Sequence, residues 1–177
     1  ALPIGLANTL AYCRRVAAPR TEFDRFLNAR GYVHKDYLND IAGTQCLRAM
    51  RYEDAVRYLG AVSRSFEGHL NTSLKWDPFV LEQTAIADCS DFKYRFADQM
   101  QALERSISIT TDPDRKAFFM LRFAIGLRNS FGFCWMLTQY YKGEYYWGQV
   151  VEKRKWEYEI LAQNAFNRSA QMITSAC

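Results

Sequence analysis

The residues of this 177-residue chain that could hold a metal ion are two histidines and five cysteines. His34 and His69 fall in or beside predicted loops and lack a spaced set of Cys, Asp or Glu partners. The cysteines are far apart, odd in number and form no Cys-x-x-Cys pair, which argues against a zinc site or a dense disulfide framework. They are Cys13, Cys46, Cys89, Cys134 and Cys177. We predict buried apolar cysteines and no metal or cofactor, with one long-range disulfide as an open alternative.

Motifs for nucleophilic catalysis or phosphate binding are missing from the sequence. It contains neither HExxH nor GxSxG, and the glycines of residues 126–132 have the wrong spacing for a P-loop and no following lysine. Paired carboxylates at Asp88 and Asp91, and at Asp112 and Asp114, fall at predicted helix starts. There a negative charge offsets the positive end of the helix dipole, so capping explains them without acid–base chemistry. The sequence therefore favours a protein without a catalytic centre.

Two arginines are candidates for binding an acidic group. Arg122 and Arg128 belong to a predicted helix that is otherwise apolar. On a concave surface they could hold an acidic group of a partner. The alternative is a structural pair with a carboxylate on a neighbouring helix, or side chains that extend along apolar surface to reach water.

The densest aromatic cluster is YYKGEYYW at residues 140–147. Its five aromatics cannot all lie on one face of a helix, so some are expected at the surface, where Tyr and Trp often dominate binding energy. The predicted partner-binding residues here are Tyr140, Tyr141, Tyr145, Tyr146 and Trp147. For Tyr145, Tyr146 and Trp147, self-association of the chain is the other functional hypothesis. The alternative is that these side chains fill the space between the last helices.

Composition limits the class of protein. Apolar residues make up 49% of the chain and charged residues 24%, which is typical of a folded domain rather than a disordered one. The net charge is +4, with basic residues interleaved among acids, so no nucleic-acid partner is expected. No apolar run approaches the roughly 20 residues that span a bilayer. We expect one domain over residues 1–177, and the initial Ala1 is expected of a processed form or of a piece of a longer protein.

Apolar spacing predicts helices throughout and no strand hairpin. The clearest helical face has Phe92, Phe96, Met100, Leu103 and Ile107 at intervals of three and four residues. The fold class is therefore all-α, with roughly seven to nine helices arranged as antiparallel pairs.

Residues 36–50 and 53–63 form two predicted amphipathic helices with a link of only two residues. So short a link forces the helices to lie antiparallel and side by side. Gly43 precedes Ala55 by twelve residues, and two small residues at this separation would let the backbones approach closely. Gly43 and Ala55 are therefore predicted at the crossing.

The segment AGTQCLRAMRYEDAVRYLGAVS, residues 42–63, resembles a tetratricopeptide repeat. That pattern places a small residue and an alanine where Gly43 and Ala55 stand, and an aromatic at the turn, where Tyr52 stands. The first-helix Trp and aromatic positions are not matched, and no proline closes the repeat near Glu67. The match covers about 34 residues. It implies helix pairs stacked as a right-handed superhelix, with an irregular helical bundle as the alternative.

Three segments, DYLNDIAGT, RYEDAVRYL and LRFAIGLRNS, resemble the helical-repeat region of large uncharacterised proteins from Bacteroidetes. That family has no assigned activity. Its members are often exported envelope proteins, so the resemblance implies an exported or cell-envelope location.

Two functional hypotheses remain. The first is a non-enzymatic helical-repeat module that binds a protein or peptide, or packs against other domains of a longer chain. The second is a helical enzyme or small-ligand domain with a pocket lined from several helices by Arg122, Arg128, Glu104 and Tyr94. A deep cavity with converging polar groups would favour the second, and an open groove or aromatic patch would favour the first.

Overall fold

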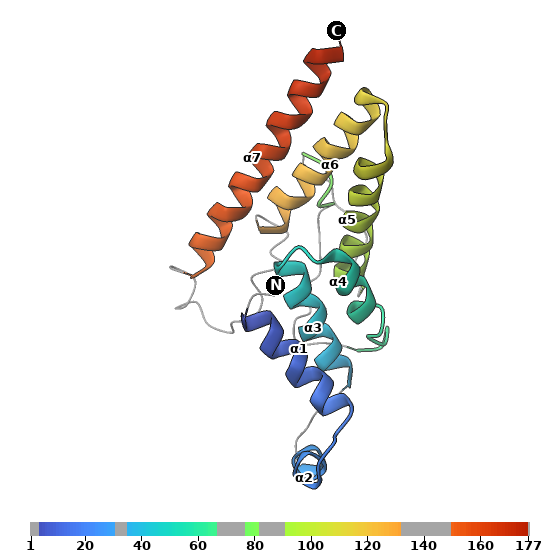
Figure 1. Ribbon diagram of the computed structural model, residues 1–177, viewed down its shortest axis with the longest axis vertical. Coiled ribbons are helices and arrows are strands. Elements are labelled where there is room, and N and C mark those ends of the chain that lie inside the picture. The colour runs from blue at the N-terminus through green and yellow to red at the C-terminus, as the bar shows by residue number, and fades with distance from the viewer. Residues whose placement is uncertain (1–3, 31–34, 67–76, 82–90, 132–149, 177) are drawn as a thin grey trace.

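A computed structural model describes residues 4–30, 35–66, 77–81, 91–131 and 150–176 (Figure 1). These residues form seven α-helices and no strand, which confirms the all-α prediction. The helices are α1 (Ile4–Ala17), α2 (Glu22–Arg30), α3 (Lys35–Arg48), α4 (Tyr52–Leu59), α5 (Phe92–Ile109), α6 (Pro113–Phe131) and α7 (Val150–Ala176). Helix α6 continues through Asn129 to Phe131.

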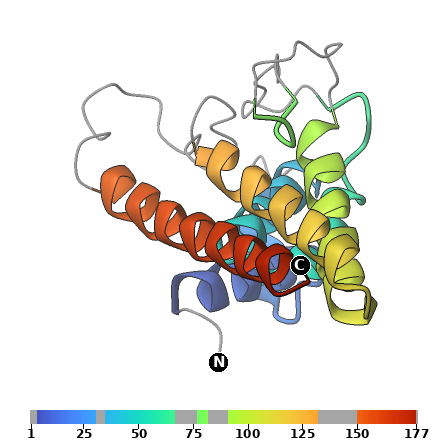
Figure 2. The ribbon, with the colours of Figure 1, turned by 90° about the horizontal axis from the view of Figure 1, so that it is seen from above.

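From α3 onward, each helix packs mainly against the next one along the chain. Thus α3 contacts α4, α4 contacts α5, α5 contacts α6, and α6 contacts α7, while α1 packs against α3. Helices α5, α6 and α7 lie side by side in both views (Figures 1 and 2). Helices α1, α3 and α4 occupy the other half, and α2 lies at the far end of the long axis (Figure 1).

Among the described residues, one hydrophobic core joins α1, α3, α4, α5, α6 and α7. On α5 the predicted apolar face is confirmed for Phe92, Phe96, Met100 and Leu103, which are buried, whereas Ile107 is half-buried. The Phe96 ring stacks on Phe79 at 5.4 Å between ring centroids. Three side-chain hydrogen bonds join α6 to other segments. Asn129 Nδ2 donates to the carbonyl oxygens of Pro78 and Val80, and Ser169 Oγ donates to Ala117 O at 2.9 Å.

The α3–α4 hairpin confirms the predicted antiparallel pair. The N–H of Ser63 donates to Asp36 Oδ1 at 3.1 Å, which joins the start of α3 to the residues after α4. Between the helices, Met50 adopts a left-handed φ of 53°, and the N–H of Arg51 returns to Cys46 O at 2.9 Å. These bonds close the end of α3 and reverse the chain within a few residues.

Gly43 lies at the helix crossing, as predicted, but the side chain nearest to it is not Ala55. Both residues are buried. A Cβ atom on Gly43 would lie 2.4 Å from Leu59 Cγ and 3.2 Å from the backbone nitrogen of Leu59, one helical turn after Ala55. The close approach of α3 to α4 therefore depends on the absence of a side chain at Gly43.

Helix α2 begins with the capping box that the sequence contains at Thr21 and Asp24. Thr21 Oγ1 accepts from the N–H of Asp24 at 3.0 Å, and Asp24 Oδ2 accepts from the N–H of Thr21 at 3.1 Å. The same carboxylate pairs with Arg15 of α1 at 2.5 Å. Asn28 Nδ2 adds a bond to Val16 O at 2.8 Å. Polar groups of α2 thus attach it to α1.

We expect the attachment of α2 to α1 to weaken in acid. The Arg15 guanidinium lowers the pKa of Asp24 from its ordinary 3.8 to about 2, with help from Thr21. A carboxyl whose pKa is lower in the folded state stabilises that state above pH 4, and this contribution is lost as pH falls through 2. Backbone hydrogen exchange at Thr21 should therefore accelerate between pH 4 and pH 2, after correction for intrinsic exchange rates.

An Asp24→Asn variant is the control for this titration, because it removes the charge at every pH. It should show fast exchange at Thr21 already at neutral pH and little further change in acid. Equal protection of Thr21 in the variant and the parent at neutral pH would contradict the role given to Asp24.

Candidate functional site

The two predicted arginines lie on different sides of α6, since six residues correspond to about 240° of helical rotation. The half-buried Arg122 places its guanidinium carbon 6.0 Å from the ring centroids of both Phe79 and Phe118. Arg128 is exposed and lines a cavity of about 410 Å³ between α6 and α7. Within the described residues neither guanidinium pairs with a carboxylate. The two arginines therefore do not form one binding site.

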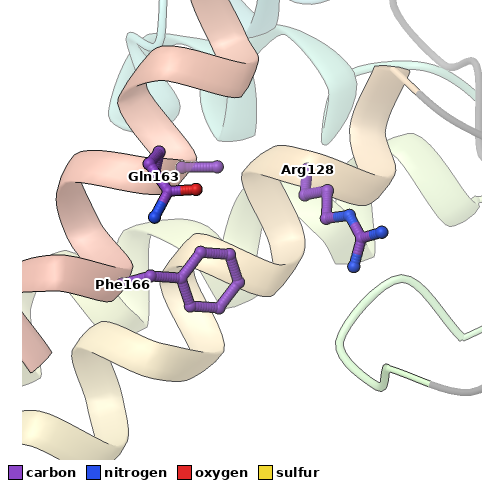
Figure 3. Close-up of a pocket in the computed structure, with 4 residues that line it drawn as sticks. Arg128, Gln163 and Phe166 are labelled. Atoms are coloured by element: carbon purple, nitrogen blue, oxygen red, sulfur yellow. The ribbon is translucent and has the colours of Figure 1, made fainter. Parts of the chain in front are cut away.

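Figure 3 shows the cavity between α6 and α7. Its described lining residues are Arg128, Ala162, Gln163 and Phe166. The Phe166 ring extends from α7 toward α6, whereas the guanidinium group of Arg128 extends away from both Gln163 and Phe166 (Figure 3). The polar groups that line this cavity do not converge on a common point.

The four residues suggested for an enzyme pocket are not brought together either. Glu104 is exposed on α5. The Tyr94 ring lies beside Gly60 at the end of α4, where a Cβ atom on that glycine would be 3.2 Å away. Neither residue lines the α6–α7 cavity with Arg128.

Several predicted residues lie outside the described part of the chain. They are His34, His69, Cys89, Cys134, Cys177, Asp88, Tyr140, Tyr141, Tyr145, Tyr146 and Trp147. The partner-binding role of the aromatic cluster therefore stays a prediction.

Among the acidic residues at described helix starts, Asp112 makes the capping bonds that the hypothesis predicts. Asp112 Oδ1 accepts from the backbone N–H groups of Asp114 at 3.0 Å and Arg115 at 3.3 Å. Asp91 occupies the N-cap position of α5, but its side chain makes no capping hydrogen bond and instead pairs with Arg95 at 2.9 Å.

Both described cysteines are free and buried, as predicted. Burial raises the pKa of the Cys46 thiol to about 11, and the charge of Asp54 adds to this effect. Burial also raises the pKa of Cys13, whose Sγ donates to Leu38 O at 3.6 Å. Thiols that stay protonated at neutral pH are poor nucleophiles, so neither is a candidate for catalysis.

A pocket of about 420 Å³ between α1, α2, α3 and α4 combines apolar walls with polar groups from several helices. Its lining residues are Cys13, Arg14, Val16, Ala17, Asn28, Lys35, Leu38, Asn39 and Tyr58. We call it the α1–α4 pocket. Most of its lining comes from the end of α1 and the start of α3, which pack against each other.

Two cationic side chains, Arg14 and Lys35, border the α1–α4 pocket and are exposed. Arg14 Nε donates to Leu10 O of its own helix at 3.1 Å, which leaves its terminal nitrogens for other partners. Within the described residues, the side chains of Lys35 and Asn39 make no hydrogen bond or ion pair. The pocket can therefore offer N–H donors and positive charge to an anionic group such as a carboxylate.

No protein-family model matches this chain, and neither a curated protein nor a solved structure was found to match it. The geometry of the described residues is therefore the basis for assigning a function.

A buried polar cluster between α3 and α5 was missed by sequence reasoning. Lys93 Nζ donates to Asp40 Oδ1 at 2.7 Å and to Thr44 Oγ1 at 3.1 Å, and Asp40 Oδ2 has no hydrogen-bond partner among the described residues. Burial lowers the pKa of Lys93, while the charge of Asp40 acts in the opposite direction. The only signal in the sequence was the spacing of Asp40 and Thr44, which lie four residues apart on one helix face. Lys93 of α5 thus connects to Asp40 and Thr44 of α3.

Metal-binding groups and membrane-spanning helices are both absent from the part of the chain that the structure describes. In these residues, no group of three or more His, Cys, Asp or Glu side chains could hold a metal ion. None of the described helices is both long enough and apolar enough to cross a membrane.

Proposed function

We propose that this chain is a non-enzymatic helical-repeat module that binds a protein or peptide partner. The packing order supports this proposal, because from α3 onward each helix contacts mainly its neighbour along the chain, as in stacked helical hairpins. The α3–α4 hairpin would be one tetratricopeptide-like unit, and α5 with α6 would be the next. A right-handed superhelix of such pairs is part of the proposal.

The α1–α4 pocket is the observation on which the peptide-binding proposal rests. In stacked helical hairpins, the first helices of successive pairs line the inner surface, and here α1 and α3 supply most of the lining. Apolar groups of Val16, Ala17 and Leu38 would contact an aliphatic part of the partner. Arg14 and Lys35 would pair with its carboxylate.

The volume of the same pocket favours a second candidate function. About 420 Å³ is within the range of small-molecule sites, so an anionic metabolite-sized ligand is the alternative.

Selection from a library of random twelve-residue peptides tests the proposal. We expect selected peptides to be rich in Asp and Glu beside apolar residues. Fluorescence anisotropy of a synthesised selected peptide should then give an affinity that falls about tenfold or more in the double variant Arg14→Glu with Lys35→Glu, because two attractive charges become repulsive.

Arg105→Glu is the matched control, because it reverses an exposed charge on α5, which does not line the pocket. It should leave the peptide affinity nearly unchanged. Selected peptides that bind the double variant as well as the parent would contradict the pocket assignment. A library that yields no binding peptide would favour the small-ligand alternative.

A further inference from the structure

Helix α2 is attached to the molecule by its polar side. Asp24 and Asn28, one turn apart, face α1 through Arg15 and Val16 O. Phe23 and Phe26 are 61% and 49% exposed. Surface helices normally bury the apolar side and expose the polar one. In α2 this orientation is reversed, so two phenylalanine rings face solvent.

The positive charge of the chain is concentrated around this helix. Residues 11–35 contain six basic and two acidic residues, a net charge of +4 that equals the net charge of the whole chain. Asp24, one of the two acids, is already paired with Arg15. The side chains of Arg20, Arg25 and Arg30 are exposed, and the guanidinium carbon of Arg30 lies 4.4 Å from the Phe26 ring centroid.

The position of α2 makes the side that carries Phe23 and Phe26 accessible to a flat surface. The helix lies at the extremity of the long axis, beyond the ends of α1 and α3 (Figure 1). A projecting helix can reach a plane without a clash from its neighbours, whereas a peptide ligand is usually bound in a concave groove.

We propose that α2 docks the chain onto an anionic lipid bilayer, with Phe23 and Phe26 inserted at the headgroup level. Amphipathic helices with Trp, Phe or Leu on one side and basic residues on the other lie in the plane of the membrane interface. The rings would bury apolar area there, and the flanking arginines would pair with lipid phosphates. Docking by this face is independent of peptide binding in the α1–α4 pocket, because the rings and the pocket lie on different sides of α2.

Co-sedimentation with lipid vesicles tests the docking. We expect the chain to bind vesicles made of equal parts phosphatidylcholine and phosphatidylglycerol, and to bind pure phosphatidylcholine vesicles much more weakly. Raising the salt concentration should weaken binding to the mixed vesicles, because it screens the arginine charges.

Two double variants separate the apolar and the charged contributions. Phe23→Ser with Phe26→Ser should reduce the partition constant about a hundredfold. Arg20→Gln with Arg25→Gln should reduce it about thirtyfold, with the loss confined to anionic vesicles. All four side chains are exposed, so the thermal unfolding midpoint should stay close to that of the parent.

Ile109→Ser is the matched control, since Ile109 is an exposed apolar residue at the end of α5. It should bind mixed vesicles as the parent does. The proposal is overturned if the parent does not bind mixed vesicles, or if both double variants bind as well as the control. It is also overturned if sedimentation velocity shows that Phe23 and Phe26 drive self-association while vesicles are not bound.

Discussion

A Gly43→Leu variant is expected to lose about 3 kcal/mol of folding stability, near the top of the usual range for overpacked cores. Even the first added atom has no room, because a Cβ on Gly43 would lie 2.4 Å from Leu59 Cγ and 3.2 Å from the Leu59 backbone nitrogen. Helices α3 and α4 would have to separate to accept the new side chain. Urea unfolding monitored by circular dichroism would measure the loss.

Two controls identify the cause of this loss. Gly5 lies in α1, and a Cβ atom placed on it would have no neighbour within 4 Å, so Gly5→Ala should be neutral or slightly stabilising through helix propensity. Gly43→Ala should destabilise less than Gly43→Leu. Combining Gly43→Ala with Leu59→Ala should cost less than the sum of the two single variants, because the shortened side chain vacates the space. Additive losses would argue against contact between these residues.

Lys93→Ala is expected to cost about 3–5 kcal/mol, because it leaves the buried Asp40 carboxylate without its cation. Lys93 Nζ supplies the only hydrogen bond that the structure assigns to the Asp40 carboxylate oxygens among the described residues. Thermal and urea unfolding would both measure this change.

The double variant Lys93→Met with Asp40→Leu removes both charges and keeps apolar volume between α3 and α5. It should be close to the parent in stability, because a buried ion pair contributes little net energy compared with apolar groups of similar size. If Lys93→Ala alone were neutral, the buried pair would not be the connection between α3 and α5 that we describe.

The parts of the fold that follow local rules were predictable. Apolar spacing indicated the buried face of α5. The short predicted link indicated the antiparallel α3–α4 pair, and in the structure this link is Ala49–Arg51. Thr21 and Asp24 form a capping box because each bond involves groups only three residues apart. Such features depend on neighbours in the chain, so a sequence is enough to recognise them.

Features that depend on contacts between distant segments were not predictable. Ala55 was the expected neighbour of Gly43, but the axial offset of α3 and α4 places Leu59 there. The Lys93–Asp40 pair joins residues 53 positions apart. The outward orientation of Phe23 follows from the bonds of Asp24 and Asn28 to α1. The apolar pattern of the sequence alone would predict a buried ring.

The candidate site was predicted less well than the fold. Arg128 was singled out and does line a cavity, but its guanidinium points away from Gln163 and Phe166 (Figure 3). The α1–α4 pocket combines residues from four helices, and no motif in the sequence connects Arg14 with Lys35. Their convergence depends on how α1 packs against α3.

Chemical-shift mapping of the ¹⁵N-labelled chain with a selected acidic peptide tests the peptide-binding proposal most directly. If the peptide occupies the α1–α4 pocket, the largest shifts should fall on residues 13–17 and 35–39, and should disappear in the Arg14→Glu, Lys35→Glu variant. Shifts concentrated around Arg128 and Phe166 instead, with residues 13–17 and 35–39 unchanged, would contradict the proposal.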